Sequence, residues 1–135
     1  MTVAFIILVM ATGILTKKTK PADVLAGYWK GTLYTGAGIT IINRHNGTTT
    51  VYLLTGNANR FDNISRFDGQ YAIKSGLFTG YCADAVGHSA ISIETSKVTM
   101  RSMQGVIFLS VEKLGTLAYD FEVTRQYNSS HWSSN

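Results

Sequence analysis

The feature that most constrains this chain is an alternation of apolar and polar residues that recurs in one short segment after another. In residues 119–125 the apolar residues Tyr119, Phe121 and Val123 alternate with Asp, Glu and Thr. Residues 28–35 follow the same pattern, with Trp29 and Leu33 on one face. Because side chains alternate between the two faces of a strand, this period of two predicts strands with one buried face.

Turn signals separate these segments and divide the region into eight strands. Asn46-Gly47 and Ser75-Gly76 each lie between two alternating segments and predict hairpins, and a third hairpin is expected to turn near Thr95-Ser96. Gly105 lies inside a segment that is long for one strand, which predicts a bulge or bend there. The predicted strands are 28–35, 39–43, 48–55, 66–74, 77–83, 89–94, 98–111 and 119–125.

Eight sequential antiparallel strands joined by short turns predict an all-β fold, an up-and-down β-barrel. Closing the sheet removes both exposed edges and leaves an interior that holds side chains or one small ligand. The alternative is a two-sheet sandwich, which needs longer crossover connections than most of these turns provide.

The two ends of the chain differ in composition from this patterned region. Residues 3–15 form an unbroken apolar run of 13, which is short for a spanning helix and typical of a signal-peptide core. We therefore expect residues 1–24 to be a signal peptide, with a secreted or periplasmic protein as the result, or else an apolar N-terminal segment that packs on the barrel. Membrane contact is expected only through this segment, if it is uncleaved. The barrel is predicted over 25–127, and 128–135 reads as a polar tail.

The net charge and the cysteine content limit which partners, disulfides and metal sites can be expected. The formal net charge is +4, but the basic residues are scattered, and only Lys17, Lys18 and Lys20 cluster, outside the patterned region. A nucleic-acid partner is not expected without a basic stripe. Cys82 is the single cysteine, so an intrachain disulfide is impossible and a structural zinc site lacks its usual ligands. We expect no metal and no cofactor.

Residues 25–31, Leu-Ala-Gly-Tyr-Trp-Lys-Gly, resemble the Gly-x-Trp motif that opens the first strand of lipocalins and related calycins. Arg125 on the last strand matches a basic residue that commonly packs across the tryptophan in that superfamily. Small lipocalin-like domains of exported bacterial proteins show a similar order of motifs, which in this chain are Trp29, then Asn46-Gly47-Thr48, then residues 67–71, then Gly105, and last residues 121–125. The second lipocalin motif, a Thr-Asp-Tyr type of loop, and the disulfide of the vertebrate transport family are absent.

The resemblance implies that Arg125 lies over Trp29 and joins the first strand to the last. A guanidinium over an indole contributes roughly 0.5 to 2 kcal/mol, while its aliphatic stem covers apolar surface. We interpret the pair as structural, and Trp29 is not expected to contact a ligand.

The only cluster of chemically reactive residues is Cys82, Asp84 and His88. Nucleophilic catalysis usually assembles such groups from separated segments, whereas these lie within seven residues. We interpret 84–88 as a loop with an exposed histidine, expect no catalytic residue, and predict that the protein is not an enzyme.

If a ligand site exists, the inward faces of the strands should form it. The predicted ligand-binding residues are Leu33, Val51, Leu53, Tyr71, Tyr81, Ile91, Met100, Phe108 and Tyr119. Ile41, Ile73, Ile93 and Phe121 are expected on the same inner surface. Buried tyrosine hydroxyls among apolar side chains are typical of small-molecule sites.

These residues predict a non-catalytic barrel that binds a small apolar or amphipathic ligand. Two alternatives stay open. In the first, the interior is filled and the barrel binds another protein through loops such as 57–65. In the second, the barrel is an enzyme of the cyclase or isomerase type, although no Asp, Glu or His lies on the predicted inner surface. The oligomeric state is not indicated by the sequence.

Overall fold

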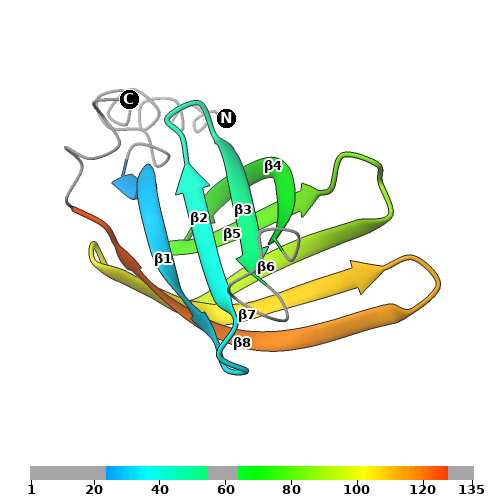
Figure 1. Cartoon of the computed structure of the whole chain (residues 1–135). Helices are drawn as coiled ribbons and strands as arrows, with labels where there is room; N and C mark the ends of the chain where they lie inside the picture. Colours follow the sequence, from blue (N-terminus) through cyan, green and yellow to red (C-terminus); the bar gives the residue numbers. More distant parts are fainter. Residues whose placement is uncertain (1–23, 55–63, 128–135) are drawn as a thin grey trace, which may run out of the picture.

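The structure, a computed structural model, describes residues 24–54 and 64–127. The regular elements of these ranges are β-strands (Figure 1). The strands are β1 (Gly27–Leu33), β2 (Gly38–Asn43), β3 (Thr48–Leu54), β4 (Ile64–Lys74), β5 (Leu77–Ala83), β6 (Ser89–Val98), β7 (Ser102–Val111) and β8 (Gly115–Arg125).

The eight strands form a closed antiparallel barrel in which each strand pairs with its neighbours in sequence. Closure comes from β1 and β8, which pair from Trp29 opposite Arg125 to Leu33 opposite Phe121. The predicted fold class is therefore confirmed. In the described ranges we find no helix with the length and apolar character needed to cross a bilayer.

The barrel has two ends, and we call the one that the segment before β1 covers the sealed end. At the sealed end β1 begins, β8 ends, and the turns 44–47, 75–76 and 99–101 lie close by (left half of Figure 1). At the far end lie the turns 34–37, 84–88 and 112–114. Val24 and Tyr127, the outermost described residues of the chain, are both at the sealed end.

Three glycines let neighbouring strands approach closely where the sheet bends. A Cβ added to Gly31, Gly69 or Gly105 would overlap backbone atoms of the adjacent strand. Glycines inside strands often mark such bends or bulges. The expected irregularity at Gly105 occurs across the ladder from it, since the β6–β7 register shifts between Thr95 and Lys97.

One predicted hairpin is wrong. The sixth strand does not turn at Thr95-Ser96 but continues to Val98, and the turn lies at 99–101. Thr95 carries the strand through this irregular point: its hydroxyl donates to the carbonyl of Phe78 and accepts from the amide of Phe78, both at 2.8 Å. The Thr95 side chain thus replaces a backbone hydrogen bond between β5 and β6. The polarity of Thr95-Ser96, on which the predicted turn was based, does not indicate such a bond.

Candidate functional site

The interior of the barrel is filled by side chains. Trp29, Phe78, Met103 and Ile107 have no exposed surface, and the remaining inward residues are nearly as buried. Large aromatic and aliphatic groups from all eight strands meet in one cluster. Protein interiors are packed as densely as organic crystals, so a core of this kind offers little space to a ligand.

Most of the predicted lining residues do face inward, but as parts of this core. Five of the nine are buried and Tyr119 is partly buried against the same cluster. The five are Leu33, Val51, Leu53, Tyr71 and Ile91. The additional inner-surface residues are also in or against the core: Ile41, Ile93 and Phe121 are buried and Ile73 is partly buried. Whether any of them contacts a ligand stays a prediction.

The inward orientation predicted for Tyr81, Met100 and Phe108 is wrong. In β5 the buried residues are Phe78 and Cys82, so strand alternation turns Tyr81 outward, where it is 62% exposed. Met100 lies in the turn between β6 and β7 and is 59% exposed, because β6 runs four residues further than expected.

In β7 the prediction also assigned the inward and outward faces the wrong way round. Met103, Gly105 and Ile107 are buried, so Phe108 lies on the outer face opposite Ala118 of β8. Met103, Ile107 and Phe78 are interior residues that the sequence interpretation missed. A signal for the β7 pair was present, since Met103, Gly105, Ile107 and Leu109 also recur with a period of two.

Trp29 and Arg125 form the predicted pair at the sealed end. The guanidinium carbon of Arg125 lies 4.6 Å from the centre of the Trp29 ring. Arg125 also donates hydrogen bonds from Nη2 to the carbonyls of Val24 (2.6 Å) and Ala26 (2.8 Å), and from Nη1 to that of Met100 (3.2 Å). The residue therefore ties together the chain before β1, the end of β8 and the β6–β7 turn.

A second set of buried bonds anchors Leu25 over the core. The carbonyl of Leu25 accepts hydrogen bonds from Trp29 Nε1 and Asn43 Nδ2, both at 3.1 Å. Asn43 in turn accepts from the Thr49 hydroxyl at 2.7 Å. Asn43 and Thr49 are almost fully buried, and these bonds satisfy them. The segment before β1 thus closes this end of the barrel.

A groove of about 480 Å³ lies beside this closure, and its surface is mostly apolar. Its walls come from the segment before β1, the end of β4, the β4–β5 turn and the β6–β7 connection. The residues that form it are Val24, Leu25, Ile73, Gly76, Val98, Thr99 and Met100. Met100 and Ile73, which were expected to line an internal cavity, are brought together here. The groove is the candidate binding site.

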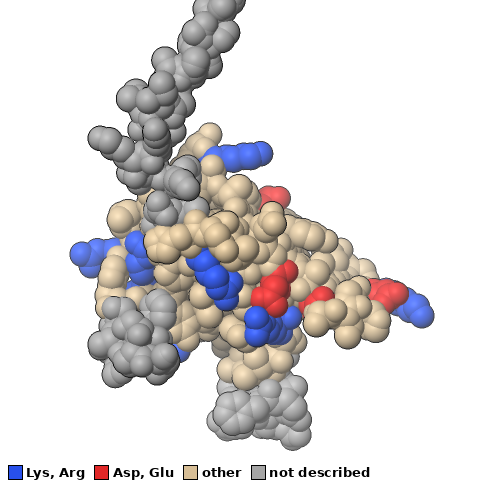
Figure 2. Space-filling model, turned by 90° about the horizontal axis from the view of Figure 1, so that it is seen from above, with Lys and Arg blue, Asp and Glu red and all other residues tan. Residues whose placement is uncertain are grey.

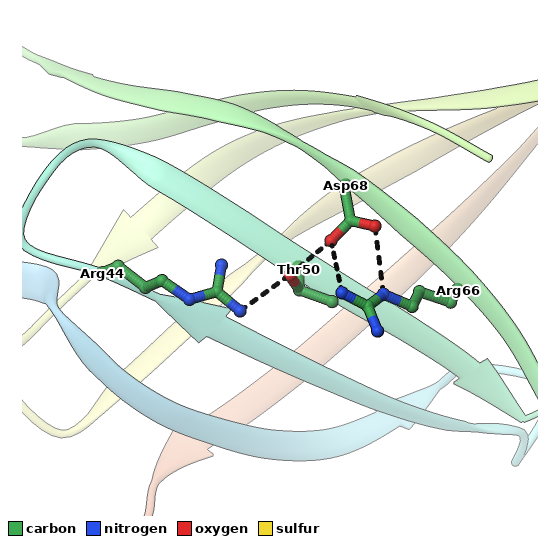
Figure 3. A network of polar contacts seen from close by, with 4 residues as sticks. All are labelled: Arg44, Thr50, Arg66 and Asp68. Atoms are coloured by element: carbon green, nitrogen blue, oxygen red, sulfur yellow. Dashed lines mark hydrogen bonds and ion pairs between the residues drawn. The ribbon is translucent and has the colours of Figure 1, made fainter. Parts of the chain in front are cut away.

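The outer face of β3 and β4 carries a polar network that could be mistaken for a catalytic site (Figure 3). Asp68 accepts hydrogen bonds from the Thr50 hydroxyl at 2.6 Å and from Arg66 Nε at 3.0 Å, and Arg44 donates to Thr50 at 2.9 Å. The bonds from Thr50 and Arg66 lower the pKa of Asp68 below its ordinary value. A carboxylate held in this state is a poor proton acceptor, and the network pins β3 to β4.

Cys82, Asp84 and His88 do not converge. Burial raises the pKa of the Cys82 thiol to about 12, which leaves almost no thiolate near neutral pH. Asp84 instead holds the β5–β6 turn, accepting from the amides of Gly87 (2.6 Å) and His88 (2.9 Å) and from the Ser89 hydroxyl (2.9 Å). The His88 side chain is 70% exposed. Across the described ranges no three His, Cys, Asp or Glu residues are grouped to hold a metal ion.

Three sequence predictions concern residues that the structure does not describe. Of the N-terminal apolar segment 1–24 only Val24 is described, the polar tail is 128–135, and the 57–65 loop lies almost wholly in 55–63.

Comparison with known proteins adds fold information. No family model and no curated protein sequence matches the chain. The crystal structure of Pallilysin (Tp0751) from Treponema pallidum is similar, with a TM-score of 0.56 and 14% identity over 94% of this chain and 97% of that one. A de novo designed fluorescence-activating β-barrel gives a TM-score of 0.51 and 12% identity, over 80% of this chain and 99% of the design. These likenesses show the barrel fold.

Proposed function

We propose that this protein is an exported, non-catalytic lipocalin-like barrel that binds a small apolar or amphipathic molecule in the groove at its sealed end. The observation that carries the proposal is a contrast between two spaces. The interior is filled by its own side chains, whereas the groove is apolar and, at about 480 Å³, falls in the usual size range of small-molecule sites.

The groove suits an amphipathic ligand. Val24, Ile73 and Val98 supply apolar walls for an aliphatic or aromatic body, and the Thr99 hydroxyl and exposed backbone near the β6–β7 turn can meet a polar head. The groove is open, so a polar head can stay in water while the apolar part is buried. Burial of apolar area is the main source of affinity expected here.

The proposals of lipocalin-like membership and of export rest on the sequence, and the position of Arg125 over Trp29 supports the first of them. The Gly-x-Trp segment begins β1, and Arg125 lies over Trp29 as the resemblance implies. The apolar run of 3–15 supports export. A role without catalysis is supported by the protonated, buried thiol of Cys82 and by the structural use of Asp84 and Asp68. The designed neighbour is a fluorescence-activating barrel, so this architecture can carry a function of that kind.

The filled interior also supports a second candidate, a barrel that binds another protein through its loops. At the far end Tyr34, Leu114 and Leu117 are 70%, 83% and 55% exposed. Exposed apolar residues gathered at one end of a domain are often interaction surfaces.

Titration with a fluorescent fatty acid such as parinaric acid separates the two candidates. The wild type is expected to bind one molecule per chain. Met100→Asp places a charge on the wall of the groove and should weaken binding by about tenfold or more. Leu114→Asp makes the same change on an exposed turn at the far end and should leave binding unaltered. No saturable binding by the wild type, or equal losses in both variants, would refute the groove as the site.

A further inference from the structure

Charge is distributed unevenly between the two ends of the barrel. The sealed end carries Arg44, Lys74, Lys97 and Arg101 on its turns and strand ends, in addition to the internally bonded Arg125. The turns at the sealed end carry no acidic residue of the described ranges. Asp84 and Glu112 are in far-end turns, and Asp68, Glu94 and Asp120 are in the middle of their strands. Glu122 lies nearer the sealed end, three residues before the end of β8, and Gln104 of β7 separates it from Lys97 of β6.

Within the described ranges, no ion pair involves Lys74, Lys97 or Arg101. The acidic residues that form ion pairs there are Asp68, with Arg66, and Glu112, with His88. In Figure 2 the blue side chains at the left have no red neighbour, and the red side chains lie at the centre and to the right. The sealed end therefore presents positive charge that no acidic residue of 24–54 or 64–127 pairs with.

Apolar side chains are exposed among these cations. Met100 and Tyr127 are 59% and 60% exposed, and Val24 and Leu77 are 37% and 36% exposed. The Tyr127 hydroxyl donates to the carbonyl of Met100 at 2.8 Å, which holds the ring beside the β6–β7 turn. Tyrosine with Lys and Arg around protruding apolar groups is the composition found at membrane–water interfaces. A purely polyanionic partner such as RNA would have no use for the apolar tips.

The rest of the chain joins the barrel at the same end. Val24 follows a segment that contains the apolar run 3–15 and then Lys17, Lys18 and Lys20, with Asp23 as its only acidic residue. An apolar run together with a basic stretch is a common pair of signals for membrane attachment, and such a stretch is attracted to anionic lipids.

We propose that the sealed end of the barrel docks on an anionic bilayer, with Lys74, Lys97 and Arg101 at the headgroups and Leu77 and Met100 dipping into the interface. The barrel itself, and not only the N-terminal segment, makes the contact. This docking does not require the groove to hold a ligand, so the two proposals can fail separately.

Vesicle flotation of the full chain tests the docking, with vesicles of phosphatidylcholine alone and of equimolar phosphatidylcholine and phosphatidylglycerol. The wild type should prefer the anionic vesicles, and added salt should reduce the preference. Removing two interfacial cations is expected to lower the preference roughly 25-fold, since each contributes about fivefold, and reversing their charge should lower it further. Lys97→Glu/Arg101→Glu tests this, and neither residue lines the groove.

The matched control is Lys30→Glu/Lys113→Glu, which makes the same change in net charge on the outer face of β1 and on a far-end turn. It should reduce the preference several times less. Leu77→Ser should weaken binding to the anionic vesicles, whereas Leu114→Ser should not. The thermal transition of each variant checks that it is folded.

Equal losses in both double variants would show a general charge effect and overturn the proposal. Equal wild-type binding to the two vesicle types would also overturn it. Salt-sensitive binding to anionic vesicles that is untouched by Leu77→Ser would point to simple polyanion binding and contradict the insertion of apolar tips.

Discussion

The seam between β1 and β8 depends on Arg125, and replacing it by methionine isolates the contribution of its guanidinium. Arg125→Met keeps an unbranched aliphatic stem of similar reach but removes the contact with the Trp29 ring and the hydrogen bonds to three carbonyls. The cation–π contact is worth about 1 kcal/mol at a partly exposed site. The bond to the part-buried carbonyl of Ala26 adds about 1 kcal/mol.

The bonds to Val24 and Met100 add less, because those exposed carbonyls accept water when the arginine is gone. We therefore expect Arg125→Met to lower the free energy of unfolding by about 2 to 3 kcal/mol. For a domain of this size the thermal midpoint should fall by roughly 10 to 20 °C.

Urea unfolding followed by tryptophan fluorescence measures the change, because Trp29, one of the two tryptophans, is fully buried in the native state. Arg101→Met is the matched control, because Arg101 is an exposed turn residue whose side chain makes no bond within the described ranges; its effect should be below about 0.5 kcal/mol. If Arg125→Met is no more destabilising than the control, the guanidinium does not hold the seam and the reasoning about closure is wrong.

Three further predictions follow from the packing and the pKa directions. Gly69→Ala should cost about 2 kcal/mol or more in urea unfolding, because the new methyl overlaps the backbone of β5, whereas Gly38→Ala, which meets only ordinary contacts, should change stability by less than about 1 kcal/mol. Cys82, with its pKa raised to about 12, should react with an aromatic disulfide reagent only as fast as the barrel unfolds, so prompt reaction of the native protein would contradict its burial. Asp68 has a pKa lowered by the Thr50 hydroxyl, so its contribution to stability is present above the ordinary pKa of 3.8 and is lost as the pH falls through the folded value. Asp68→Asn should therefore lose less stability than the wild type between neutral pH and about pH 3, and an unchanged acid limb would count against the network.

The barrel could be predicted from the sequence because its signals are local. Alternation gave the strands, Asn46-Gly47 and Ser75-Gly76 gave two hairpins, and the Trp29–Arg125 pair indicated which strands close the sheet. The turn after β6 could not be placed, since the polar residues at Thr95-Ser96 look like a turn but are bridged by a side-chain hydrogen bond to β5.

The direction in which some side chains face was harder to predict. In β5 the inward set contains a glycine and a cysteine, while Leu77 and Tyr81 point outward, so apolar character alone favours the wrong face. β7 is apolar on both faces over 106–109, and the same ambiguity moved Phe108 inward in the prediction.

The groove could not be predicted because it belongs to no single segment. Val24, Ile73 and Met100 come from parts of the chain that only the closed barrel brings together. Their apolar character was visible in the sequence, but their common location was not.

Methyl NMR of the full chain during titration with a fatty acid tests most directly where the barrel binds. The methyl signals of groove residues Val24, Leu25 and Val98 are predicted to shift in a saturable way, while those of the interior residues Val51 and Ile91 stay in place. Large shifts of Val51 and Ile91 with none in the groove would mean that the ligand enters the core, and would contradict a filled barrel that binds at its sealed end.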